Sequence, residues 1–138
     1  MPLVGGGGTG NVAGSSNPSG TGQSLNYIGD HAYLYTGFTS VNNVETIIAR
    51  FSTGNLYIVG TFQPQMDRSG GSDNYRFRVK INNEIVISCQ TTSAQDYTPY
   101  EEIEILIPSN SVIEITAENV TDTDANDIGS IIIGRVYA

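Results

Sequence analysis

The sequence is poor in the residues that most enzymes use. It has one cysteine, one histidine and no tryptophan in 138 residues. A single chain therefore has neither a disulfide framework nor a metal site built from several histidines or cysteines. Basic residues are also scarce, since six lysines and arginines stand against fourteen acidic residues, a formal charge of −8. Phosphate backbones and anionic lipids attract the opposite charge. We expect a protein without a cofactor that binds neither nucleic acid nor a membrane.

Residues 1–24 lack charged side chains and hold eight of the sixteen glycines. This composition is typical of a flexible coil, because it offers too little apolar surface to fold. The glycine run at residues 5–8 does not predict a phosphate-binding loop, since no strand or helix pattern flanks it. The start of the chain has no signal-peptide pattern, so we expect a protein that is made in the cytoplasm and not secreted. We call residues 1–24 the arm and expect residues 25–138 to form a single domain.

From residue 25 onward the apolar residues follow the period of β-strands, and no window shows a helical period. The clearest segment runs from Tyr75 to Ile81, where every second residue is apolar. After Asn82 and Asn83, the pattern places Ile85, Ile87 and Cys89 in one phase. Asparagine tolerates the positive φ of a two-residue hairpin turn, so this segment predicts a β-hairpin.

A second hairpin is predicted from the apolar residues of 103–107 and 113–115, joined across residues 108–111, because Pro108 ends the first strand. Four further strands are predicted at residues 31–35, 44–52, 56–63 and 128–137. About eight strands with Gly, Asn, Asp and Ser between them predict an all-β fold. We expect an antiparallel β-sandwich that is jelly-roll-like, with a flexible Gly-rich N-terminal arm.

Few residues are candidates for catalysis. His31 and Cys89 would make a base and a nucleophile if the fold joined them, but both fit structural roles better. Cys89 shares the phase of apolar neighbours, as a small buried residue does. Glu102 and Glu104 lie on one face of a strand, and the alternating isoleucines mark that face as the polar one. We therefore expect that the protein is not an enzyme.

The acidic segment at residues 121–127 resembles the start of a calcium loop, because its oxygen-bearing side chains alternate. The turn glycine and the final glutamate of that loop are missing. Two interpretations stay open. The segment is an acidic solvated turn without a metal, which we favour, or Asp122, Asp124 and Asp127 contribute to a looser calcium site at a strand end.

Charge is unevenly distributed along the chain. Residues 101–127 hold eight acidic groups and no basic one, whereas residues 50–80 hold five of the six basic groups. If the strand with Arg76, Arg78 and Lys80 adjoins the strand of Glu102 and Glu104, cross-strand ion pairs follow. If the two strands lie on opposite flanks, the charges favour a head-to-tail contact between subunits.

A Gly-rich leader, a body of strands alone, the segment 101–115 and the final segment 131–137 together resemble small jelly-roll proteins that decorate the heads of tailed bacteriophages or build their fibres. The resemblance implies a capsid decoration or cement protein on the virion surface. Such a protein is usually a homotrimer, binds the major capsid protein and stabilises the shell by mass action. In this interpretation Leu3, Val4 and Val12 anchor the arm on the capsid, unless the arm is a passive linker.

The alternative is a carbohydrate- or receptor-binding β-sandwich module of a viral fibre. Tyrosines such as Tyr27, Tyr33, Tyr35, Tyr97 and Tyr100 would then stack on sugars, with calcium held by the acidic segment. Against this alternative, tryptophan is absent and tyrosine is common in any strand.

Overall fold

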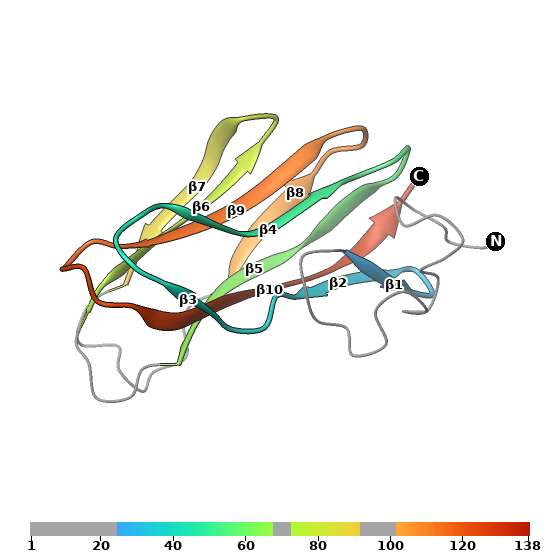
Figure 1. The fold of residues 1–138 in the computed structure, drawn as a ribbon. Coiled ribbons are helices and arrows are strands. Elements are labelled where there is room, and N and C mark those ends of the chain that lie inside the picture. The colour runs from blue at the N-terminus through green and yellow to red at the C-terminus, as the bar shows by residue number, and fades with distance from the viewer. Residues whose placement is uncertain (1–24, 68–72, 92–101) are drawn as a thin grey trace.

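The computed structural model describes residues 25–67, 73–91 and 102–138, which form ten β-strands in two antiparallel sheets packed face to face (Figure 1). In chain order the strands are β1 (Asn26–Ile28), β2 (His31–Tyr35), β3 (Thr39–Val41), β4 (Thr46–Ser52), β5 (Tyr57–Asp67), β6 (Tyr75–Ile81), β7 (Glu84–Gln90), β8 (Ile103–Ile107), β9 (Val112–Asn119) and β10 (Asn126–Tyr137). The all-β sandwich predicted from the sequence is confirmed.

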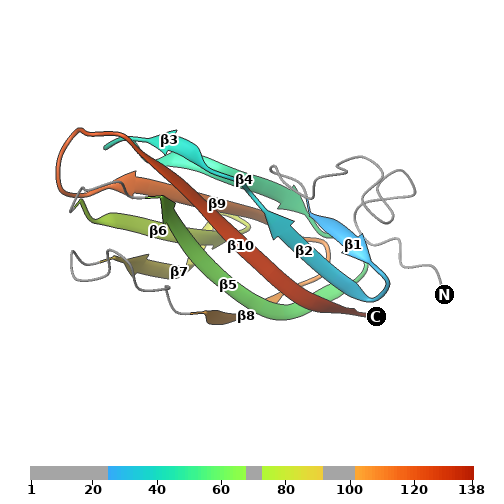
Figure 2. The same cartoon turned by 90° about the horizontal axis from the view of Figure 1, so that it is seen from below.

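We call the six-stranded sheet sheet A and the four-stranded sheet sheet B. Sheet A has the order β1-β2-β10-β5-β8, with β3 also paired to β10, and sheet B has the order β4-β9-β6-β7. Figure 2 shows β10 crossing sheet A between β2 and β5. Strands that follow each other in the chain mostly lie in different sheets, which is a jelly-roll-like arrangement. The described residues contain no helix long and apolar enough to cross a membrane.

The core lies between the sheets and is filled by every second residue of each strand. Phe62 and Ile132 of sheet A, and Phe77 and Ile115 of sheet B, are fully buried. Burying a large apolar side chain contributes about 1.5–3 kcal/mol, so this single core is the main source of stability.

The hairpin around Asn82 and Asn83 is confirmed. The two residues have φ angles of 51° and 69°, and they join β6 to its antiparallel neighbour β7. Both angles lie in the left-handed region, where asparagine is tolerated better than most residues. The strands predicted at 31–35, 44–52, 56–63 and 128–137 are also present as β2, β4, β5 and β10.

The predicted hairpin across residues 108–111 is wrong. β8 pairs with β5 in sheet A, whereas β9 pairs with β4 and β6 in sheet B. Residues 108–111 therefore carry the chain from one sheet to the other. Thr53 stabilises this connection, since its hydroxyl donates to the Pro108 carbonyl oxygen at 2.7 Å and accepts from the Ser111 amide at 3.0 Å.

The predicted phase of β7 is wrong at Ile85, near the start of the strand. An irregularity of register between Val79 and Lys80 leaves Val86 as an extra residue in β7. Ile87 and Cys89 consequently pack against the core, whereas Ile85 is 53% exposed. A β-bulge shifts every later side chain to the opposite face, and periodicity alone does not reveal it.

Two short strands and the length of β5 were not predicted. β1 and β3 have three residues each, too few for a periodic pattern. β5 continues through Pro64, which ordinarily interrupts a central strand. β8 pairs only with residues 58–62 of β5, so β5 has one partner strand at Pro64, as at a sheet edge.

Candidate functional site

The outer face of sheet A carries large apolar side chains. Alternation along the strands turns six of them outward, each at least about one-third exposed: Tyr35, Tyr57, Val59, Leu106, Ile133 and Tyr137. We call these six residues the apolar face. They come from β2, β5, β8 and β10, which are neighbours in the sheet.

Strand register sets two pairs of these residues side by side, and the exposed Arg135 lies among them, opposite Val59. Val59 lies opposite Leu106, and Tyr57 lies opposite Tyr137. The rings of Tyr57 and Tyr137 stack with their centroids 5.4 Å apart. Single exposed apolar side chains are ordinary on proteins, but several gathered on one sheet face favour a contact surface.

A shallow hollow of about 230 Å³ lies beside this face, lined by Tyr35, Gly37, Phe38, Gln65, Gly129, Ser130 and Ile131. Phe38 is 55% exposed at its rim. A Cβ added at Gly129 would lie 2.3 Å from the Gly37 carbonyl oxygen, so the backbone approaches too closely there for any other residue. The hollow combines two aromatic rings with the side-chain amide of Gln65.

Of the five tyrosines considered for stacking on sugars, three lie in the described residues. Tyr27 is buried in the core and offers no free ring face. Tyr33 and Tyr35 lie on the outer side of β2 with their centroids 5.4 Å apart. Tyr97 and Tyr100 lie outside the described residues.

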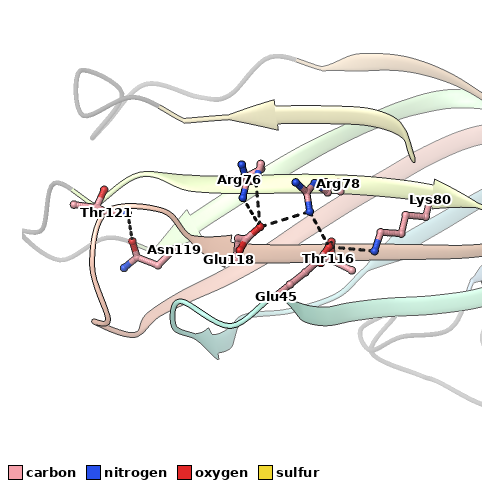
Figure 3. A network of polar contacts seen from close by, with 8 residues as sticks. All are labelled: Glu45, Arg76, Arg78, Lys80, Thr116, Glu118, Asn119 and Thr121. Atoms are coloured by element: carbon pink, nitrogen blue, oxygen red, sulfur yellow. Dashed lines mark hydrogen bonds and ion pairs between the residues drawn. The ribbon is translucent and has the colours of Figure 1, made fainter. Parts of the chain in front are cut away.

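The outer face of sheet B is polar, and Figure 3 shows its network of ion pairs. Arg76 binds Glu118 at 2.7 Å, and Lys80 binds Glu45 at 3.2 Å. Arg78 lies between these pairs, 3.5 Å from Glu45 and 3.6 Å from Glu118. The two outer faces of the sandwich therefore differ in chemistry.

This network bears on the two interpretations of the charge pattern. β6, which carries Arg76, Arg78 and Lys80, pairs with β9 and not with β8. Its cations therefore meet Glu118 and Glu45 instead of the glutamates at 102 and 104. The cross-strand pairing is internal to the domain, with different carboxylates from those expected, and the three cations are already occupied.

Glu45 is held in this network as a carboxylate. The Thr116 hydroxyl donates to it at 2.7 Å, and the cations of Lys80 and Arg78 lie nearby. Chiefly through the Thr116 hydrogen bond, and then through the cations against the opposing effect of burial, the pKa of Glu45 is lowered from its ordinary value.

A carboxylate cluster lies at one end of the sandwich, where the loop after β9 meets the start of β6. Oxygens of Asp73, Asp122 and Asp124 all lie within 4.8 Å of one another. The Asn119 side-chain amide is 3.0 Å from Asp73 and 3.2 Å from Asp122, and the Asn126 amide is 3.2 Å from Asp73.

Tyr75 of β6 forms hydrogen bonds to two other strands at this end of the molecule. The Tyr75 hydroxyl donates to the Val41 carbonyl oxygen at 2.6 Å and accepts from the Asn126 backbone amide at 3.0 Å. Burial raises the pKa of this phenol. The strands β3, β6 and β10 are thereby tied together beside the carboxylates.

The structure assembles only part of the predicted calcium set. Asp122 and Asp124 come together, but Asp127 lies within β10, opposite Ser40 and Asp67. Asp73 is the third carboxylate of the cluster, and no sequence pattern pointed to it. The signal would have been the register of β6 with β9, which sets Tyr75 opposite Asn119 and so brings the residues before β6 to the acidic loop. Three carboxylates, with the Asp124 carbonyl oxygen bonded to the same Asn119 amide, are hard oxygen ligands of the kind that Ca²⁺ takes.

The candidate catalytic pair is not assembled. His31 begins β2 in sheet A, where its Nδ1 lies 3.1 Å from Asp30 in an exposed setting. Cys89 lies in β7, at the edge of sheet B, and packs partly against the core. Burial raises the pKa of its thiol, which disfavours the reactive thiolate. The proposed arm anchors Leu3, Val4 and Val12 lie outside the described residues.

Comparison with known proteins gives no family. No family model and no curated protein matches the sequence. Among solved structures, Eiger TNF from S. frugiperda is similar at 10% identity, with a TM-score of 0.43, over 78% of this chain and 92% of that chain. A family 35 carbohydrate binding module from Clostridium thermocellum is similar at 17% identity, with a TM-score of 0.33, over 75% of this chain and 68% of that chain.

A third similarity, to dimeric latent PorU from Porphyromonas gingivalis, has 17% identity and a TM-score of 0.37. It covers 86% of this chain but only 14% of that chain. The β-sandwich assignment rests on the strands and their pairing, and these similarities assign no activity.

Proposed function

We propose that this chain is a non-enzymatic structural protein whose copies associate through the apolar face of sheet A. The observation that carries the proposal is the concentration of six exposed, large apolar side chains on one sheet face. The outer face of sheet B, by contrast, is covered by ion pairs. The separation of His31 and Cys89 into different sheets supports a non-catalytic role, because these are the chain's only histidine and cysteine.

The apolar face alone would give a modest affinity. A contact that removes about 500 Å² of apolar surface from water contributes on the order of 12 kcal/mol. Association itself costs about 4–15 kcal/mol. The two amounts are of the same order, so the face stabilises an assembly best where several contacts act together, as they do in a ring or on a shell.

In its specific form, the proposal is a homotrimeric decoration or cement protein of a virus capsid that binds the major capsid protein on the virion surface. The support for this form is the resemblance of the sequence to phage head proteins. The protein would add interfaces that exist only in the assembled particle, and so would stabilise the shell by mass action.

The proposal is tested by measuring the solution mass of three full-length proteins by light scattering. We expect a trimer for the wild type and for Ile47→Ser, and a monomer for Ile133→Ser. Ile47 is a matched control, because it is 43% exposed on the outer face of sheet B whereas Ile133 is 45% exposed on that of sheet A. A wild type that stays monomeric, or an Ile133→Ser protein that stays trimeric, would contradict the proposed interface.

The specific form has its own test, which is co-sedimentation with purified phage heads that lack a decoration protein. We expect the wild type to pellet with the heads and to raise their melting temperature. A trimer that binds no capsid would retain the association proposal and remove the capsid role.

The hollow beside the apolar face favours a second candidate function, carbohydrate binding. Aromatic rings such as Tyr35 and Phe38 stack on the C–H faces of sugars, and the Gln65 amide can bond to hydroxyl groups. Retention on a glycan array, in the presence and absence of calcium, tests it. We expect Tyr35→Ala and Phe38→Ala to lose retention if the hollow is the site, while Tyr57→Ala keeps it.

A further inference from the structure

The two edge strands β7 and β8 border a groove along one side of the sandwich. β7 ends sheet B and β8 ends sheet A, and Figure 2 shows both strands along the same edge of the molecule. The groove between them has a volume of about 570 Å³. Its apolar lining consists of Ile81, Val86, Ile87, Ile105, Leu106 and Pro108.

Among the described residues β7 has a partner strand on one side only, and its edge is unusually apolar for such a strand. Ile85 and Val86 of β7 are 53% and 50% exposed, and β7 carries a single charged residue, Glu84. Edge strands with free backbone groups and apolar side chains pair readily with other chains, so natural proteins cover or charge them. The groove is therefore a surface that an extended segment would stabilise.

The charge of the groove narrows the choice of occupant. Glu84 and Glu104 lie in its walls, and no lysine or arginine among the described residues forms an ion pair with either of them. The chain as a whole has a formal charge of −8, and its acidic segments would be repelled there. Residues 1–24 have no charged side chain, and residues 1–4 have the sequence Met-Pro-Leu-Val.

The arm is long enough to reach the groove of its own domain. Asn26, Tyr33, Ile133, Thr61 and Glu104 are successive partners across sheet A, so the arm joins the domain at the same level as Glu104. Four strand spacings of about 4.8 Å separate the two edges by about 19 Å. A Gly-rich tether of twenty residues has a root-mean-square length of about 25 Å. The length of the arm is therefore sufficient to cover the distance between the two edges of sheet A.

This match favours the chain's own arm over that of another copy. A tether whose length fits the span gives an effective concentration of about 1 mM. The arm of an unassociated second copy, at micromolar protein concentration, is about a thousandfold more dilute. We propose that residues 1–4 bind in the β7–β8 groove of their own chain, with Leu3 and Val4 on its apolar lining. This inference goes beyond the proposed function and does not depend on it.

Hydrogen exchange of the full-length protein, followed by mass spectrometry, tests the proposal. In the Leu3→Ser/Val4→Ser double variant we expect the amides of residues 84–88 and 104–107 to exchange about three- to tenfold faster than in the wild type. The matched control is Val12→Ser, which removes an apolar side chain of the arm outside residues 1–4. Unchanged exchange in the double variant, or equally fast exchange in the control, would overturn the proposal.

Two further readouts define the occupant. Val86→Asp places a charge in the groove at an exposed position, so it should speed exchange of residues 104–107 while the far strand β4 is unaffected. Protection of residues 84–88, which lie outside the apolar face, should not change in the wild type between about 1 and 100 µM protein, because the contact is intramolecular. Protection that disappears on dilution would assign the groove to a second copy and overturn the proposal. The assembly variant Ile133→Ser should leave this protection intact, so failure of one proposal is separable from failure of the other.

Discussion

The side chain of Asn119 shows how one buried residue fixes the position of a polar loop. Asn119 is 3% exposed at the end of β9. Its carbonyl oxygen accepts from the amides of Thr121 and Asp122 at 2.8 and 3.2 Å, while its amide group contacts Asp73 and Asp122. One side chain therefore satisfies backbone donors and partly offsets the repulsion between carboxylates.

Replacing Asn119 by alanine should lower the free energy of unfolding by about 2–3 kcal/mol, because buried groups are left without hydrogen-bond partners. Urea unfolding followed by fluorescence of the tyrosines measures the change. The exposed Asn43→Ala serves as control and should change the free energy by less than about 0.5 kcal/mol. Equal effects of the two substitutions would contradict the role of Asn119.

Glu45 gives the fold a dependence on pH whose sign follows from its environment. The pKa of Glu45 is lower in the folded protein than its ordinary value of 4.5, chiefly because the Thr116 hydroxyl donates to the carboxylate. The carboxylate therefore stabilises the folded state above pH 4.5, and this contribution is lost as the pH falls through the lowered pKa.

The Glu45→Gln variant should be less stable than the wild type at pH 7 by up to about 1 kcal/mol, since the side chain is partly exposed. The difference should shrink as the pH is lowered below 4.5, and thermal melts between pH 7 and pH 3 measure it. Glu84→Gln is the control, because Glu84 has no ion pair among the described residues. A difference that grows toward acid pH would contradict the sign.

At the scale of the strand, local sequence patterns were sufficient to predict the turn at Asn82-Asn83, but they were not sufficient to predict which strands pair. The Asn82-Asn83 dipeptide predicts its turn because the required backbone angles are a property of those two residues. Residues 108–111 carry similar turn residues, yet they connect different sheets. The partner of a strand depends on which apolar face covers which, and that is decided across the whole domain.

The connection at residues 108–111 depends on Thr53, which is 7% exposed. Its hydroxyl is bonded to the Pro108 carbonyl oxygen and the Ser111 amide. Thr53→Val keeps the shape and removes both bonds, so it should cost about 1–3 kcal/mol of unfolding free energy. Thr39→Val, at an exposed strand position, should cost less than about 0.5 kcal/mol in the same urea titration. An unchanged free energy of unfolding in Thr53→Val would show that the connection does not need this hydroxyl.

At the scale of the molecule, the sandwich presents two outer faces of opposite character. The apolar residues of the sheet A face are spread along the sequence from Tyr35 to Tyr137, and only the strand order brings them together. The sequence therefore predicted a domain of strands and two of the three clustered carboxylates, Asp122 and Asp124, but not the apolar face. The bulge at Val86 and the register between β5, β8 and β10 are long-range features that periodicity does not encode.

The most direct test of the central claim is photo-crosslinking from a benzophenone side chain placed at position 137, within the proposed contact, or at position 47 on the opposite face. Tyr137 and Ile47 are 42% and 43% exposed, so the two probes begin from equal access to solvent. Association through the apolar face predicts a covalent dimer from position 137, with the crosslinked peptide in β2, β5, β8 or β10, and little product from position 47. Crosslinks from position 47 alone, or none from position 137 at concentrations where the protein is oligomeric, would contradict the account.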